Sequence, residues 1–398
     1  MTCLLSNTLI PGIVYGGEFS GYIGAQTRNF FEDALSPEQH DNSLSIVTEP
    51  EFFHEWDNAD QNIEIKLFYR ADQYDKQRTH ADIRELSWTR VYEDWEIRAG
   101  ISKVFWGVAE TQHLVDIINQ TDQVENVDGE DKLGQPMIKL STERDWGAID
   151  LFILPGFRER TFPGNEGRPR PQVIIDTGRD AIYDSSAEEK HIDFAARYSH
   201  YIGEWEFGLS LFSGTGRDPT DFRPVATNAS GTAIVVPVYS LINQLGLDGQ
   251  AFFGDWTWKL ETAYIEVRTG AKKGTSSLKT EGGFEYTLVG IADSQMDLGF
   301  VVEYHYSDNQ ITDTIFDNDL STALRFVLND AQSTEILAGI TTDVDTQTIG
   351  SFIEASRRLG DSWTLEAQLR TFHGTKKGRP LYGFRSDNFA QIDLNFHF

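Results

Sequence analysis

The densest group of side chains that could bind a cation lies in residues 106–134. This stretch carries the carboxylates of Glu110, Asp116, Asp122, Glu125, Asp128, Glu130 and Asp131, and the imidazole of His113. Carboxylate oxygens bind calcium, and residues 126–129 have part of the spacing of a calcium-binding loop. The full pattern fails, because Val124 stands at the first ligand position and Gln135 at the twelfth. We therefore expect no cofactor and no dedicated metal site, although an acidic loop can hold calcium adventitiously.

Residues that could perform catalysis do not form a recognisable set. The 9 histidines have no paired zinc-binding spacing, and the only cysteine is Cys3. Residues 214–217 lack the lysine of a phosphate-binding loop. Pairs such as His113 with Glu110, or His191 with Ser185, are not joined to a serine nucleophile by any motif. We expect that the protein is not an enzyme.

The segments that must position these residues alternate with period two. Residues 389–398 place Ala390, Ile392, Leu394, Phe396 and Phe398 on one side of a strand and polar residues on the other. Similar patterns predict eighteen strands, over residues 18–31, 43–56, 60–72, 81–92, 94–105, 136–144, 147–154, 191–201, 204–213, 238–253, 256–267, 280–291, 296–306, 321–330, 334–342, 346–357, 361–372 and 388–398. Sixteen is the alternative count, because residues 135–155 and 323–340 are the least regular.

The connections between these strands alternate between short and long. Short ones, such as residues 57–60 and 93–94, are hairpin turns, whereas residues 31–42, 106–134 and 155–190 are long and mostly charged. A soluble β-sandwich would not separate its connections in this way. The sequence therefore predicts an all-β fold, a transmembrane antiparallel β-barrel with lipid outside and water inside.

In such a barrel the charged side chains of the strands line the lumen. The basic ones lie on early strands and comprise Lys66, Arg70, Arg84, Arg90, Arg98, Lys139 and Arg197. The acidic ones lie on later strands and comprise Asp248, Glu261, Glu285, Asp297, Glu303, Glu335, Glu354, Glu366 and Asp393. Two arcs of opposite sign would create a field across a pore, although any single charge could equally pair along the wall.

The connection 106–134 has features of a constriction. Its residues 111–120 place Leu114, Val115, Ile117 and Ile118 at helical spacing, which predicts a short helix with one apolar side. We expect this segment to fold into the barrel as the third long loop, pack on the wall and narrow the lumen with the carboxylates and His113 named above.

Composition restricts the partners. The net charge of −28 disfavours nucleic acid, because phosphates would be repelled. It favours inorganic cations or cationic solutes. No Lys or Arg precedes the apolar start of the chain, so we expect residues 1–16 to be a truncated signal-peptide remnant and residues 17–398 to form one outer-membrane barrel domain.

The strand and turn pattern from about residue 18 to residue 398 resembles the outer-membrane porins of Gram-negative bacteria. The most specific features are the folded-in loop after the fifth strand and the terminal Phe398. The resemblance implies a passive diffusion channel among outer-membrane lipid and lipopolysaccharide. It also implies that Leu394, Phe396 and Phe398 are an assembly signal for the barrel assembly machinery. The strand count differs from that of the common sixteen-stranded porins, which leaves the oligomeric state open.

We expect the channel to carry small hydrophilic solutes or ions and to prefer cations. One alternative is a specific channel for an oligosaccharide or organic acid, with Trp88, Phe105 and Trp106 as stacking surfaces. A second is a non-conducting adhesion barrel that binds partners through its long loops.

Overall fold

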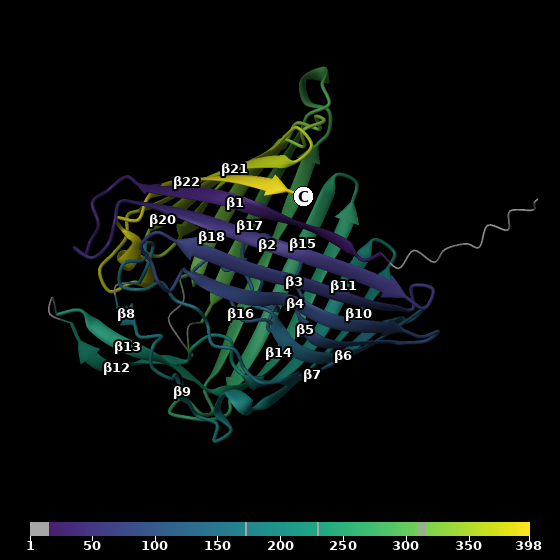
Figure 1. Ribbon diagram of the computed structural model, residues 1–398, viewed down its shortest axis with the longest axis horizontal. Coiled ribbons are helices and arrows are strands. Elements are labelled where there is room, and N and C mark those ends of the chain that lie inside the picture. The colour runs from purple at the N-terminus through teal and green to yellow at the C-terminus, as the bar shows by residue number, and fades with distance from the viewer. Residues whose placement is uncertain (1–15, 172, 229–230, 309, 312–314) are drawn as a thin grey trace, which may run out of the picture.

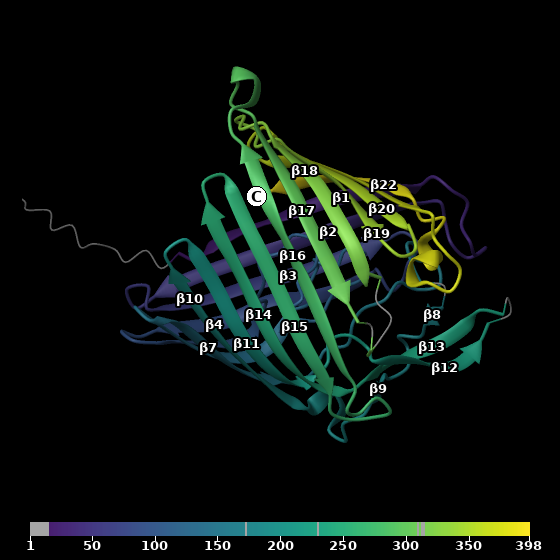
Figure 2. The same cartoon turned by 180° about the vertical axis from the view of Figure 1, so that it is seen from behind.

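The protein folds into one closed antiparallel β-barrel of eighteen strands, seen from opposite sides in Figures 1 and 2. The computed structural model describes residues 16–171, 173–228, 231–308, 310–311 and 315–398. Apart from Gly16, the predicted signal-peptide remnant lies outside these residues. The strands of the barrel are β1 (Glu18–Phe30), β2 (Asn42–Trp56), β3 (Gln61–Asp72), β4 (His80–Val91), β5 (Glu96–Ser102), β6 (Gln135–Arg144), β7 (Gly147–Pro155), β10 (Ile192–Ile202), β11 (Trp205–Thr215), β14 (Leu241–Phe253), β15 (Trp256–Val267), β16 (Ser276–Leu288), β17 (Asp297–Ser307), β18 (Asn318–Val327), β19 (Glu335–Asp343), β20 (Ile349–Leu359), β21 (Trp363–His373) and β22 (Phe389–His397).

Each strand pairs with its neighbours along the chain, and the last strand pairs back to the first. Tyr22 on β1 lies opposite His397 on β22, and Phe30 lies opposite Phe389. This pairing closes the sheet, so that no long edge of the barrel is left unpaired. The predicted strand count of eighteen and the antiparallel barrel are confirmed.

The two faces of the barrel wall differ in chemistry. Apolar side chains on the outer face are exposed, among them Leu209, Leu211, Leu245, Leu247, Leu324, Ile340 and Ile353. Exposed aromatic residues gather near the short turns, including Trp95, Trp146, Trp205, Trp256 and Trp363, and a second group near the long loops includes Tyr69, Tyr264, Tyr304 and Tyr306. The inner face carries the polar partners of the same strands. An apolar band between two aromatic rims is typical of a barrel whose outer surface contacts lipid.

A β-bulge in β4 changes the direction of the side chains that follow it. Lys66 lies opposite Glu85 and Leu67 opposite Ile83, so Arg84 is the extra residue. Beyond the bulge, Ser87 and Thr89 are buried on the inner face, whereas Trp88 and Arg90 share the outer face with Leu86. Placing Arg90 on the pore wall was therefore wrong, as was offering Trp88 as a stacking surface in the lumen. The Arg90 guanidinium lies 4.9 Å from the centre of the Tyr92 ring.

A second, four-stranded sheet lies at the long-loop end of the barrel (Figure 1). It consists of β8 (Ile174–Ile175), β9 (Ile182–Tyr183), β12 (Asp221–Thr227) and β13 (Ala233–Tyr239). Residues 238–240, predicted as the start of a barrel strand, belong to β13 or to the link before β14. Three short 3₁₀ turns, η1 (Glu188–Lys190), η2 (Ile291–Asp293) and η3 (Pro380–Phe384), are the helical elements of the described residues. No helix in this part of the chain is long and apolar enough to cross a membrane.

Candidate pore constriction

The connection between β5 and β6, residues 103–134, forms hydrogen bonds with strands from both halves of the barrel. On its first limb, backbone N–H groups meet acidic side chains of the wall. Glu261 on β15 accepts hydrogen bonds from Val108 at 2.6 Å and Ala109 at 2.9 Å. Glu303 on β17 accepts from Glu110 at 2.9 Å and Thr111 at 2.8 Å. These two carboxylates compensate their burial by binding backbone dipoles, as buried acids must.

On the second limb the roles are exchanged: the loop supplies the carboxylates, and the wall supplies basic side chains that bind them. Both oxygens of Glu125 accept from Arg70 on β3, with Nη2 at 2.6 Å from Oε2. Asp122 accepts from Arg84 Nη2 at 2.6 Å and lies 3.1 Å from His80 Nε2. Burial raises the pKa of Asp122, but the contacts with His80 and Arg84 outweigh that effect and lower the pKa to about 2. The loop is thus fixed electrostatically at both limbs.

Further arginines reach the loop, and the sequence analysis did not single them out. Arg28 Nη2 donates to the Glu125 carbonyl at 3.3 Å, and Arg78 Nε donates to the Val124 carbonyl at 3.0 Å. Arg217 Nε donates to the Ile118 carbonyl at 3.0 Å. Arg78 and Arg217 lie in long connections and bind carbonyl groups, which no residue pattern could reveal. Arg28 was detectable, since it falls on the inner face of the first predicted strand.

The apolar side of the loop packs on the wall, but not as a helix. Residues 111–120 form turns and bends, so the predicted helix was wrong. Trp106, Val115 and Ile118 are buried against a cluster that includes Phe152 on β7 and Phe212 on β11. Hydrogen bonds from the loop backbone to wall carboxylates replace the bonds that a helix would make within itself. The loop thus packs beside β7 and β11, whereas residues of β17–β21 line a cavity on its other side.

The predicted constriction residues that remain have diverse surroundings. Glu110 contacts Lys259 at 2.8 Å and Arg325 at 2.6 Å, and Asp128 contacts Arg370 at 2.7 Å. Asp116 is buried beside Lys132 at 3.3 Å. Glu130 is 3.0 Å from His113 Nε2, and its side chain is 54% exposed. Asp131 is exposed.

Most wall charges are paired with a neighbour. On the basic side, Lys66 contacts Glu51 at 2.9 Å, Lys139 contacts Asp150 at 3.1 Å, Arg197 binds both oxygens of Asp248, and Arg98 donates to Thr89. On the acidic side, Glu285 contacts Lys259, Glu335 lies 3.5 Å from Arg325, Glu354 contacts Arg370 at 2.6 Å and Asp393 accepts from Gln26. Asp297 accepts from the backbone of Gly290 beside a short turn, and Glu366 lies opposite Asp393 in the ladder. The charges therefore act largely in local pairs and in holding the loop.

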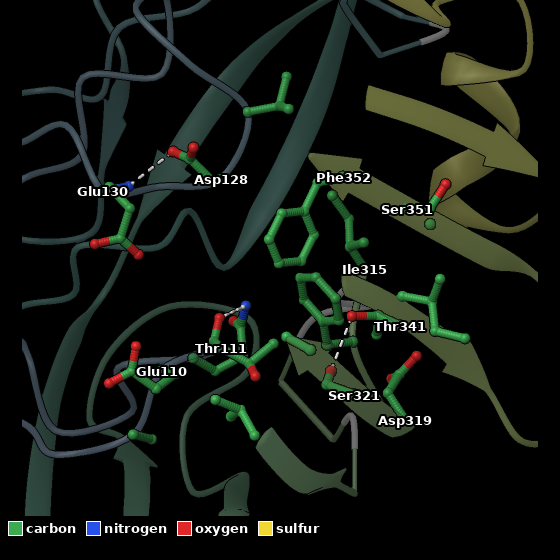
Figure 3. A pocket seen from close by; sticks show the side chains of 18 of the residues that line it. Glu110, Thr111, Asp128, Glu130, Ile315, Asp319, Ser321, Thr341, Ser351 and Phe352 are labelled. Carbon is green, nitrogen blue, oxygen red and sulfur yellow. Dashed lines mark hydrogen bonds between the residues drawn. The ribbon is translucent and has the colours of Figure 1, made fainter. Parts of the chain in front are cut away.

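Two cavities border the loop. One has a volume of about 530 Å³ and the other about 430 Å³. Both are lined by Thr111, Gln112, His113, Val127, Asp128, Glu130, Ile315, Phe316 and Phe384. The shared residues therefore lie where the two cavities adjoin. Figure 3 shows the larger cavity, with loop residues such as Glu110, Asp128 and Glu130 on one side and Phe352, Ser351 and Thr341 on the other.

One group of side chains in the described part of the chain has the spacing of a metal site. It consists of His80, Asp122 and Glu125, whose ligand atoms all lie within 4.8 Å of one another. The same carboxylates bind the guanidinium groups of Arg84 and Arg70. Those two positive charges occupy the oxygens that a cation would need, so the group serves to hold the loop.

The closed ladder, the apolar outside and the loop-crossed polar inside define the class: the chain is a porin-like antiparallel β-barrel. No protein-family model matches the sequence, and no curated protein matches it. Among solved structures, the chain is similar to OmpT, an outer membrane protein of Vibrio cholerae in its trimer form, with 9% identity over 96% of this chain and 99% of that chain and a TM-score of 0.48. It is also similar to a triple mutant of Rhodopseudomonas blastica porin, with 11% identity over 96% of this chain and 100% of that chain and a TM-score of 0.45.

Proposed function

We propose that the protein is an outer-membrane channel through which small hydrophilic solutes and ions diffuse passively. The observation that carries this proposal is a pair of cavities that border the loop inside a closed barrel and have part of their lining in common. The apolar band between aromatic rims supports a membrane location, because that surface would be unfavourable in water.

The channel prefers cations over anions. The larger cavity is lined by the carboxylates of Glu110, Asp128, Glu130, Asp319 and Glu354, and by the single guanidinium of Arg370. Lys259 and Arg325 contact Glu110 from outside the lining. Carboxylates therefore remain in excess, and they raise the local concentration of cations in a confined lumen.

The test is a reversal-potential measurement across a KCl gradient in a planar lipid bilayer. The expected sign is that of potassium permeation, and Glu130→Gln is expected to move the potential toward zero. Glu204→Gln is the matched control, because Glu204 lies in an exposed short turn between β10 and β11. Anion preference in the native protein would refute the selectivity, and the absence of any conductance would refute the channel.

The terminal residues serve assembly in this proposal. Leu394, Phe396 and Phe398 share the exposed outer face of β22 with Ile392. An outward apolar edge at the closing strand is accessible to the barrel assembly machinery before β22 pairs with β1, and it contacts outer-membrane lipid and lipopolysaccharide afterwards.

A further inference from the structure

We propose that the larger cavity is a binding site for amphipathic organic cations, which carry one ammonium group on an aromatic or alkyl body. This inference rests on the proposed channel function and names a ligand class for it. The cavity of about 530 Å³ is large enough for one small organic molecule. Its two sides differ in chemistry, and that difference defines the ligand.

The loop side of the cavity offers negative charge. Glu110 and Asp128 are each compensated by basic groups, Lys259 and Arg325 for Glu110 and Arg370 for Asp128. Glu130 has a different environment, since it contacts His113 at 3.0 Å and its side chain is 54% exposed. Glu130 is therefore the carboxylate most accessible to an incoming ammonium group.

The remaining charged groups of the lining also favour a cation. Asp319 accepts backbone N–H groups from Asp317 and Asn318. Glu354 shares Arg370 with Asp128. Five carboxylates in the lining are thus opposed by Arg370 and by the two basic groups that contact Glu110, which leaves the cavity negative even when His113 is protonated.

The opposite side presents aromatic rings. Phe352 on β20 lines the cavity, and the Arg370 guanidinium lies 5.6 Å from the centre of its ring. Phe372 and Phe384 also line it, with ring centres 5.6 Å apart. Aromatic faces attract cations and bury apolar groups, and the Phe352 ring already has a cation within the range of this interaction.

Carboxylates and rings on opposite sides favour one ligand class over others (Figure 3). An ammonium group can approach Glu130 while its apolar body covers Phe352. An inorganic cation would use the carboxylates without the rings. An organic anion would meet the negative side of the cavity and be repelled.

The test is calorimetric titration of the folded barrel in detergent with three probes. Benzyltrimethylammonium carries both features, tetramethylammonium carries only the charge, and benzoate carries the ring with the opposite charge. Benzyltrimethylammonium is expected to bind about tenfold more tightly than tetramethylammonium, because both cations can reach Glu130 but only the benzyl group can pack on the Phe352 ring. Benzoate is expected not to bind.

Two variants and two controls locate the site. Phe352→Ala and Glu130→Gln are each expected to weaken benzyltrimethylammonium binding by about tenfold. Glu204→Gln removes an exposed carboxylate of a short turn outside the cavity lining, and Phe222→Ala removes a ring that lines only the smaller cavity. Both controls are expected to bind the probe like the native protein.

Equal affinity for the two ammonium probes would overturn the inference, as would binding of benzoate or unchanged binding by Phe352→Ala. Titration does not require conduction, so it separates this inference from the channel proposal. A barrel that conducts potassium but does not bind the probe would refute only the ligand site. A barrel that binds the probe but never conducts would refute only the channel.

Discussion

Glu303→Gln tests whether the wall carboxylates hold the loop in place. Glu303 Oε1 accepts from the Glu110 backbone at 2.9 Å, while Oε2 accepts from the Thr111 backbone at 2.8 Å and the Thr111 hydroxyl at 2.5 Å. Hydrogen bonds to a charged group contribute roughly 1.5–3 kcal/mol each. The glutamine keeps one acceptor oxygen but turns an N–H₂ group toward a backbone donor.

Because two of the three bonds can persist and lumen water can reach the third donor, we expect a loss of about 2 kcal/mol in loop docking. That loss makes the undocked loop about 30-fold more populated. Single-channel recording should show more frequent current fluctuations, and limited proteolysis should cleave residues 107–115 faster. The strand ladder is untouched, so the folded barrel should keep its gel mobility before boiling.

Glu335→Gln is the matched control for this substitution. Glu335 also points into the lumen, but in the described part of the chain it contacts Arg325 at 3.5 Å and not the loop, and its side chain is 48% exposed. Its removal should leave the loop docked. Equal fluctuations and equal cleavage rates in native protein, Glu303→Gln and Glu335→Gln would refute the assigned role of Glu303.

Three further outcomes follow from the loop and the closing strand. Arg84→Ala leaves the buried Asp122 without its guanidinium, and we expect the second limb to loosen by about 3–5 kcal/mol, measured as faster proteolysis of residues 121–133. Because the pKa of Asp122 is lowered from 3.8 to about 2, its contribution to docking is complete above pH 4 and is lost as pH falls toward 2. Proteolysis between pH 5 and pH 2 should show this loss in native protein and a smaller change in Asp122→Asn, in which the other loop and wall carboxylates remain. Deleting Phe398, whose ring contacts Phe19 at 5.5 Å, should reduce assembly in cells, but purified protein should still refold to the heat-modifiable form.

The strands were predictable because the two faces of each strand lie in different environments, so that apolar and polar side chains alternate along it. Period-two alternation set β15 at residues 256–267, as observed, and set β11 within two residues of Trp205–Thr215. Burial on one face specifies the register strongly, since a shift of one residue would move every apolar side chain to the wrong side. Strand β16 begins four residues earlier than predicted, at Ser276, because Ser276 and Ser277 are small and polar like loop residues.

The bulge in β4 had a readable signal that alternation alone concealed. Apolar residues occur at Ile83, Leu86 and Trp88. Ile83 and Leu86 are three residues apart, whereas regular alternation would place them two residues apart. That change marks one inserted residue and moves Arg90 to the outer face. The small sheet β8, β9, β12 and β13 gave no such signal, because two of its strands have only two residues each.

The partners of the charged side chains could not be derived from the strands that carry them. The sign of each wall was readable from the sequence, but Arg70 meets Glu125 and Arg370 meets Asp128, 242 residues away, only because the loop crosses the closed barrel. The loop presents carboxylates to the basic wall and N–H groups to the acidic wall. Many charges of both walls are therefore compensated by their contacts with the loop. In the proposed channel, the field that a solute meets is set by the charges that this pairing leaves uncompensated, among them the exposed Glu130. We therefore expect the selectivity of that channel to depend less on the two opposing walls than on the incomplete neutralisation of one loop.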